Sequence, residues 1–151
     1  MIHMAFDPGA KGGIAIQYNC DKGTVVLPMP LSGKSVNLRS LMSYVKNAEV
    51  TVYIERVHSM PKQGVASTFK FGMNYGKIIG MCQAMGWRYH FVTPQKWKAY
   101  VLAGTKRDKD AAITTAKQLF PDINLVPEGK RKEHDGIADA LCILYYGMNM
   151  L

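Results

Sequence analysis

One segment restricts the fold of this chain more than any other, residues 50–54 with the sequence Val-Thr-Val-Tyr-Ile. Apart from Thr51 the segment is apolar, and it is rich in β-branched residues, a composition typical of a strand that is covered on both faces. A strand of that kind lies in the interior of a sheet. It ends at Glu55, and the carboxyl ends of interior strands are where open α/β sheets bind their ligands.

The other elements are predicted from turn residues and hydrophobic spacing. Strands are expected over residues 2–6, 14–16 and 24–27, where glycine-rich turns indicate an antiparallel meander. Helices are expected over 38–45 after the capping residue Asn37, over 64–85, over 95–102, from 105 or 108 to 119, and from about 133 to 146, with one more strand over 89–92 and loops over 28–34 and 125–132. This order predicts an α/β fold, a mixed five-stranded sheet flanked by helices on both faces. The length of 151 residues fits a single domain, 1–151.

The expected long helix carries glycines at four-residue spacing, Gly72, Gly76 and Gly80. They share a stripe with Val65 and Phe69. Since each glycine costs a helix about 1 kcal/mol relative to alanine, the spacing indicates close packing on that face. The partner is either the sheet or another subunit, and packing within the chain is the simpler alternative.

The charge of the chain favours a polyanionic partner. Lys and Arg number 19 against 11 Asp and Glu, which gives a net charge of +8 and a pI near 9.4. Nucleic acid is the first candidate and an anionic membrane surface the second. No apolar run is long enough to span a membrane and no basic helix has an aromatic face, so no membrane partner is expected.

The amino-terminal residues and the cysteines predict a cytoplasmic location. The start MIHMAFDPG lacks the basic and apolar regions of a signal peptide. Cys20, Cys82 and Cys142 are far apart, odd in number and without a CxxC pair, which indicates buried thiols in a reducing compartment.

Four carboxylates are candidates for one site. Asp7 closes the first strand before Pro8-Gly9, and Glu55 closes the interior strand. If those two strands are neighbours, both acids meet at one edge of the sheet. Asp135 and Asp139 share a face of the last helix, where like charges repel unless a cation lies between them or one is protonated. Oxygen ligands favour Mg²⁺ or Mn²⁺, and such sites commonly hold two ions roughly 3.5–4 Å apart that act on a phosphodiester.

Simpler interpretations exist for some of these residues. Asp7 could be an ordinary turn residue, and Asp135 could be a helix-start acid stabilised by the helix dipole. The neighbouring His134 could be a metal ligand, a general base or a histidine satisfied at the start of the helix. Glu55 and Asp139, which follow or interrupt apolar runs, are harder to explain without a site.

The motifs together resemble the RuvC family of Holliday-junction resolvases, within the RNase H-like superfamily, and in particular its short phage-type members. They are Asp-Pro-Gly at 7–9, Ile-Glu-Arg-Val at 54–57, Phe-Lys-Phe-Gly at 69–72 followed by Gly76, and Ala-Asp-Ala-Leu at 138–141. The similarity spans nearly the whole chain. It implies a homodimer in a bacterial or phage-infected cell that binds four-way DNA junctions and nicks two strands symmetrically, with Mg²⁺ or Mn²⁺ held by the four carboxylates.

Two features depart from the family's pattern. Bacterial members place the last two acids three residues apart, whereas here the spacing is four and Gly136 occupies the intermediate position. Either Asp135 reaches in from one residue further, or His134 or a water replaces it. His58 stands where the resemblance implies an aromatic residue that wedges into the junction, although a histidine ring can still stack on a base.

Basic residues are concentrated between Glu55 and Glu133, a segment that contains fourteen Lys or Arg and only four acids. The residues expected to contact DNA are His58, Lys62, Lys70, Lys77, Lys96, Lys98, Lys106 and Arg107. The resemblance implies that Lys98 and Lys109 contact DNA or the scissile phosphate, Lys109 as part of the catalytic set. A solvated basic face is the alternative for any single lysine.

Other functions compete with the junction resolvase. One is a less selective endonuclease that also cuts forks, flaps and three-way junctions. Another is an ATPase of the actin and hexokinase type, because residues 7–13 also resemble its phosphate loop, but the chain is too short for two lobes. The last is a DNA-architectural protein without activity, against which the retained acids argue.

Overall fold

The computed structural model describes residues 1–19, 23–59, 61–106, 108 and 110–151. The elements are, in chain order, β1 (Ile2–Asp7), β2 (Gly13–Tyr18), β3 (Thr24–Pro28), β4 (Leu31–Ser32), β5 (Ser35–Val36), the 3₁₀ helix η1 (Leu38–Ser43), β6 (Val50–Glu55), α1 (Val65–Ala84), β7 (Arg88–Val92), α2 (Pro94–Val101), α3 (Ala111–Leu119) and α4 (Asp135–Met150).

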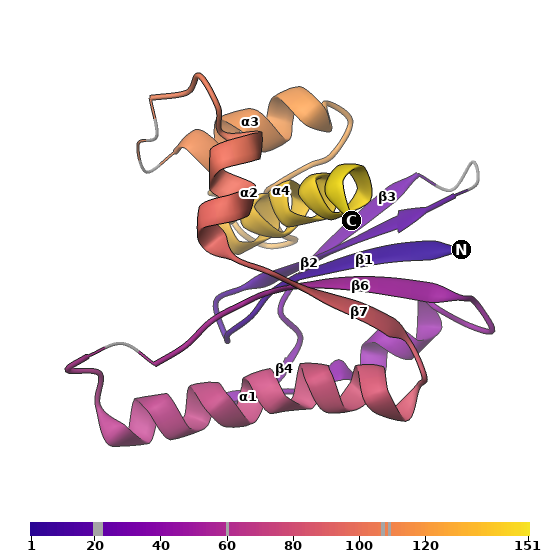
Figure 1. The fold of residues 1–151 in the computed structure, drawn as a ribbon, viewed down its shortest axis with the longest axis vertical. Helices are drawn as coiled ribbons and strands as arrows, with labels where there is room; N and C mark the ends of the chain where they lie inside the picture. The colour runs from indigo at the N-terminus through magenta and orange to yellow at the C-terminus, as the bar shows by residue number, and fades with distance from the viewer. Residues whose placement is uncertain (20–22, 60, 107, 109) are drawn as a thin grey trace.

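The main sheet has five strands in the order β3-β2-β1-β6-β7. The first three strands are antiparallel, and β6 runs parallel to β1 on one side and to β7 on the other. Helix α1 lies along one face of this sheet, and α2, α3 and α4 lie on the other (Figure 1). The predicted α/β fold, a mixed five-stranded sheet with helices on both faces, is confirmed.

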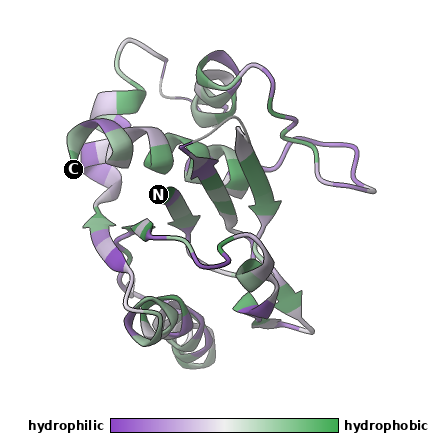
Figure 2. Cartoon of the chain, turned by 90° about the vertical axis from the view of Figure 1, so that its right-hand side faces the viewer, coloured by the Kyte–Doolittle hydropathy of each residue, from purple (hydrophilic) through white to green (hydrophobic). Residues whose placement is uncertain are grey.

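Two apolar cores follow from the alternation of side chains along the strands. Ala5, Ala15 and Tyr53 point toward α4, whereas neighbours such as Phe6 and Ile54 point toward α1. Small residues under α4 let it lie close to the sheet, and α2 and α3 pack against it as well. Figure 2 shows much of the sheet's interior in the colour of hydrophobic residues, although some strand ends are hydrophilic.

Several elements differ from the sequence-based expectation. Helix α3 begins at Ala111, not at residue 105 or 108. The segment expected as a helix over 38–45 is a 3₁₀ helix that ends at Ser43, although Asn37 caps it as predicted by accepting a hydrogen bond from the Arg39 N–H. The expected loop 28–34 contains the small hairpin formed by β4 and β5. The last helix begins two residues later than predicted and continues to Met150, because its apolar spacing extends past Tyr146.

The glycine face of α1 does not pack within the described chain. The buried residues of the helix are Asn74, Ile78 and Cys82, on its opposite side. A Cβ added to any of the glycines at 72, 76 and 80 would have no heavy atom within 4 Å. Packing against the sheet, the simpler alternative for this stripe, is therefore wrong.

Cys82 and Cys142 are free and buried, as predicted, and burial raises the pKa of each thiol to about 12. Cys20 lies outside the described residues. Within the described part of the chain, no helix combines the length and apolar character needed to cross a membrane.

Candidate active site

The sheet brings Asp7 and Glu55 to the same edge. Strands β1 and β6 are parallel neighbours, and Phe6 pairs with Ile54 in their register. Parallel strands end at the same side of a sheet. The residues that follow this pair, Asp7 and Glu55, therefore lie at the same end of the sheet. The predicted adjacency of the two strands is confirmed, and each acid is only partly exposed.

The start of α4 is held against the turn that follows Asp7. Gly12 and Gly136 form a backbone bridge between the two segments. A Cβ on Gly136 would lie 2.5 Å from the carbonyl carbon of Gly12 and 2.6 Å from the carbonyl oxygen of Lys11, so no other residue fits there. The position three residues before Asp139 therefore carries no side chain, and the first acid of α4 is Asp135.

Three of the four carboxylates form one electrostatic cluster. Burial, followed by the charges of Asp139 and Glu55, raises the pKa of Asp7 to about 8, and Lys98 opposes this shift. Burial, followed by the charge of Glu55, raises the pKa of Asp139 to about 6, with Lys98 opposing and Asp135 adding to the shift. Asp135 itself is exposed, at the margin of the cluster beside Asp139.

The cluster has ligand chemistry for a cation but is not closed around one. Among the described residues, no three His, Cys, Asp or Glu side chains stand close enough together to hold a metal ion. Charges act on one another over longer distances than a coordination bond of about 2 Å. The raised pKa values and the absence of a closed metal site among the described residues therefore both fit carboxylates that face one another and repel. The ion pair found among those residues, Lys117 with Glu133 at 2.6 Å, lies outside the cluster, and Lys98 is the cation that acts on Asp7 and Asp139.

His134 caps α4. Its ring Nδ1 accepts a hydrogen bond from the Ile137 N–H at 3.2 Å, and the backbone N–H of His134 donates to the carbonyl oxygen of Leu125 at 2.9 Å. Of the three roles considered, this geometry is that of a histidine satisfied at the start of a helix. Nε2 is the ring nitrogen that stays available to a ligand or a proton.

The predicted DNA-contacting residues divide into two groups. His58, Lys62, Lys70, Lys96, Lys98 and Lys106 are exposed. Lys77 is half-buried, and its ammonium donates to the Ser35 hydroxyl and to the Val36 carbonyl, which ties α1 to β5. Arg107 and Lys109 lie outside the described residues.

Two hollows flank Phe71 next to the acid cluster. One, of about 310 Å³, is lined by Arg56, Val57, His58, Gln63, Phe71 and Pro94. The other, of about 600 Å³, includes Lys11, Lys70 and Phe71 in its lining. A third hollow of about 460 Å³ lies at the opposite end of β6, where Val50 and Trp87 line it and none of the predicted site residues occurs.

The sequence-based prediction missed Trp97, whose Nε1–H donates a hydrogen bond to Glu55 Oε1 at 2.8 Å. In the sequence it lies between Lys96 and Lys98, two of the lysines expected to contact DNA. A tryptophan on the apolar face of a short helix normally indicates core packing, and no local signal identifies the acceptor of its N–H.

The strand order, with acids at the ends of β1 and β6 and on the closing helix, defines an RNase H-like fold. Solved structures support this assignment. Thermus thermophilus RuvC is 17% identical with a TM-score of 0.58, and the match covers 99% of this chain and 96% of that one. The T. thermophilus RuvC complex with a Holliday junction substrate is 14% identical, with the same TM-score of 0.58 and coverage of 99% and 96%.

The Fowlpox virus resolvase in complex with its substrate Holliday junction DNA is also similar, at 17% identity and a TM-score of 0.54 over 99% of both chains. At such identities the likeness establishes the fold, which is RuvC-like, as the sequence motifs implied. No protein-family model matches the sequence, and the comparison with curated proteins gave no match.

Proposed function

We propose that this protein is a metal-dependent, structure-selective DNA endonuclease that nicks four-way junctions by phosphodiester hydrolysis. The observation that carries the proposal is the convergence of the partly buried Asp7, Glu55 and Asp139 at one edge of a RuvC-like sheet. Burial of like charges is unfavourable unless a cation joins them or one of them is protonated, so the arrangement favours binding of a cation over a stabilising role.

The residues fit hard divalent cations, Mg²⁺ or Mn²⁺. Asp7, Glu55 and Asp139 would hold them, with Asp135 as a fourth oxygen donor from the exposed start of α4. Ions in such sites activate water and stabilise charge on the leaving oxygen of a phosphodiester. Two ions are proposed, since four carboxylates supply more negative charge than one ion neutralises.

Exposed lysines around the acid cluster would bind the DNA backbone. The charge of Lys98 opposes the rise in the pKa values of Asp7 and Asp139, so its ammonium lies close to the position where a scissile phosphate would approach. Lys70 borders the hollow beside the turn that follows Asp7, and His58 borders the one beyond Glu55. In the hollow beyond Glu55, an unpaired base would stack on His58 or Phe71.

Symmetric nicking requires two active sites, and α1 supplies a surface for a second copy. Its outer face exposes Val65 at 87%, Phe69 at 74% and Met73 at 45%. The glycines on the same face have open space around them. We therefore propose a homodimer in which the α1 helices of two copies pack together, with the glycines allowing close approach.

The direct test uses labelled four-way, three-way and linear DNA, each incubated with Mg²⁺, Mn²⁺ or EDTA. Metal-dependent paired nicks confined to the four-way substrate are the expected result. Binding without cutting under all conditions would contradict the nuclease and favour an architectural DNA-binding protein.

A second candidate is a less selective endonuclease that also cuts forks, flaps and three-way junctions. It is favoured by the exposed His58 at the position of the aromatic wedge, since a smaller ring discriminates less between branched substrates. Equal cutting of three-way and four-way DNA in the same experiment would support this candidate.

A further inference from the structure

The chain brings Trp97 over the end of β6 through local geometry. Glu55 pairs with Val92, the last residue of β7. Thr93 then caps α2, and its side chain accepts a hydrogen bond from the Lys96 N–H. Trp97 therefore lies one turn into a helix that starts beside Glu55, and its side chain is fully buried.

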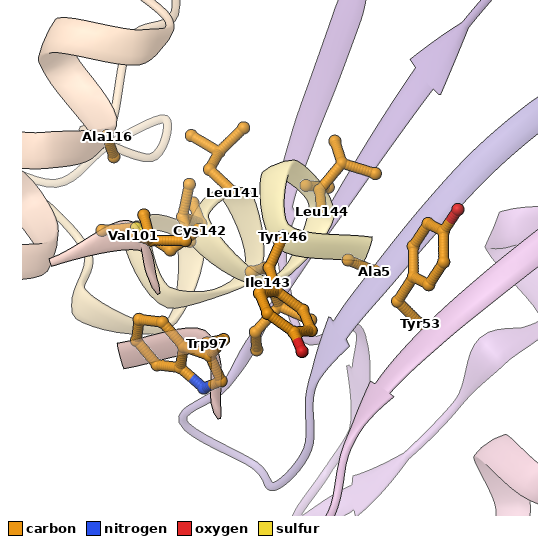
Figure 3. Packing of buried hydrophobic residues seen from close by; sticks show 14 of the residues in the cluster. Ala5, Tyr53, Trp97, Val101, Ala116, Leu141, Cys142, Ile143, Leu144 and Tyr146 are labelled. Atoms are coloured by element: carbon orange, nitrogen blue, oxygen red, sulfur yellow. The ribbon is translucent and has the colours of Figure 1, made fainter. Parts of the chain in front are cut away.

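The indole is fixed by the apolar core and presents its polar edge to the acid cluster. Its ring belongs to the core cluster around α4, and Figure 3 shows the nitrogen on the side away from Val101 and Cys142. A buried N–H without an acceptor costs about 1–3 kcal/mol. Here the acceptor is Glu55 Oε1, 2.8 Å from the indole nitrogen, rather than a backbone carbonyl.

The same ring also contacts the basic side of the site. Lys98 Nζ lies 5.2 Å from the centre of the Trp97 ring, within the range of a cation–π interaction. One rigid side chain thus contacts both a candidate metal ligand and a lysine that acts on the acid cluster.

We propose that Trp97 is a positioning residue: its indole N–H holds Glu55 Oε1 so that Oε2 is presented to the divalent cation. This inference rests on the proposed metal-dependent function. A carboxylate held by a hydrogen bond loses less side-chain freedom when an ion binds, which is how outer hydrogen-bond partners raise the affinity of metal ligands.

The first test measures Mn²⁺ binding to the DNA-free protein by isothermal titration calorimetry. Trp97→Phe removes the N–H and keeps an aromatic ring, and it should weaken Mn²⁺ binding about 10–100-fold, the usual effect of losing such a partner. Trp87→Phe is the matched control, because Trp87 is also buried, at 9% exposure, but lies at the opposite end of the sheet. It should leave Mn²⁺ affinity unchanged.

A double variant separates positioning from general packing. If Trp97 acts through Glu55, adding Trp97→Phe to Glu55→Gln should weaken Mn²⁺ binding no further than Glu55→Gln alone. A packing defect would instead weaken the remaining ligands in both backgrounds.

The second test leaves Trp97 intact, so it does not depend on whether the variant folds. The chain has two tryptophans, and Trp87→Phe identifies the indole N–H signal of each in a ¹H–¹⁵N spectrum. Saturating Mg²⁺ should shift the Trp97 indole N–H signal in the unsubstituted protein but not in the Glu55→Gln variant.

The inference would be overturned if Trp97→Phe and the unsubstituted protein bound Mn²⁺ with equal affinity, to within about twofold. It would also be overturned if the Trp97 indole N–H signal did not shift when Mg²⁺ was added. Either result would leave the metal-dependent function standing. Absence of any Mn²⁺ binding to the unsubstituted protein would overturn both.

Discussion

Asp7 bears the largest electrostatic cost in the candidate site. Its pKa is raised from 3.8 to about 8, first by burial and then by the charges of Asp139 and Glu55. A carboxyl group in this state favours folding when it is protonated and opposes it when ionised. The site residues are therefore costly to the metal-free protein, as expected where function rather than stability determines a residue.

Asp7→Asn should stabilise the metal-free protein at alkaline pH. Protonated Asp7 contributes stability that is fully present below about pH 4 and is lost as the pH rises through about 8, because the folded pKa exceeds the unfolded value of 3.8. In EDTA at pH 9 the variant should gain at least about 1 kcal/mol, or about 2–4 °C in Tm, over the unsubstituted protein. At pH 4 the two should unfold alike.

Asp122→Asn, which changes an exposed aspartate after α3, is the control and should shift Tm equally at both pH values. A gain for Asp7→Asn that did not grow with pH would contradict the assigned pKa.

Glu55→Gln and Asp7→Asn should abolish cleavage without weakening binding to a four-way junction. Losing an outer hydrogen-bond partner of a ligand costs about 10–100-fold, so losing the ligand itself should leave less than about one hundredth of the cleavage rate. Removing negative charge from a surface that faces phosphates does not oppose binding. Single-turnover cleavage and filter binding measure the two effects, and a variant that lost both would identify a structural acid instead.

At the scale of elements, the contact between the turn after β1 and the start of α4 aligns the site. The two backbones meet at Gly12 and Gly136, where no side chain fits. This contact positions Asp139 beside Asp7 although the two residues come from opposite ends of the chain. It also accounts for the four-residue spacing of the acids in α4.

Gly136→Ala should therefore destabilise the protein and impair the site. The added methyl group would overlap backbone atoms of Gly12 and Lys11, and overpacking of this kind costs about 1–3 kcal/mol or more. Gly64→Ala is the comparison, because a Cβ there meets only Ser67 Oγ at 3.9 Å, and it should cost less than about 1 kcal/mol. Thermal unfolding measures both, and equal losses would contradict the tight contact.

The outer face of α1 yields a prediction about assembly. Phe69→Asp places a charge at the centre of the exposed apolar stripe and should convert a dimer to a monomer without lowering the Tm of the monomer, since Phe69 contributes little to the core. Light scattering after size exclusion measures the mass. Met148→Asp, at an exposed apolar position on α4, should remain dimeric, and a monomeric unsubstituted protein would refute the α1 interface.

At the scale of the whole molecule, the net charge of +8 is distributed unevenly. Acids gather at one edge of the sheet, and exposed lysines of α1, α2 and the following loop lie in the surrounding segments. In the proposed function, such an arrangement would attract the DNA backbone and would keep one negatively charged position for cations. Long-range attraction of this kind is screened by salt.

Junction affinity should fall steeply with salt. If six to ten phosphates are neutralised, affinity should drop about 10³–10⁵-fold between 50 and 200 mM salt. Lys96→Ala should reduce the slope of log affinity against log salt concentration by about 1. Lys77→Ala should change this slope less, because the Lys77 ammonium donates hydrogen bonds to Ser35 and Val36. A slope near zero in fluorescence anisotropy titrations would contradict the electrostatic account.

The sequence by itself determined the parts of this protein that depend on local patterns. The apolar run before Glu55 specified an interior strand, the turn at Asp7-Pro8-Gly9 ended another, and the spacing of Asp135 and Asp139 specified their shared helix face. These features rest on backbone periodicity and on the preferences of single residues, which are present before any tertiary contact forms.

Only the tertiary structure decided which faces meet. The glycines of α1 face outward while Asn74, Ile78 and Cys82 are buried, a choice that helical spacing leaves open. The contact of Gly12 with Gly136 joins backbones 124 residues apart, and the bond from Trp97 to Glu55 joins side chains 42 residues apart. Contacts over such separations depend on how the elements pack, and packing is a property of the whole chain rather than of any segment.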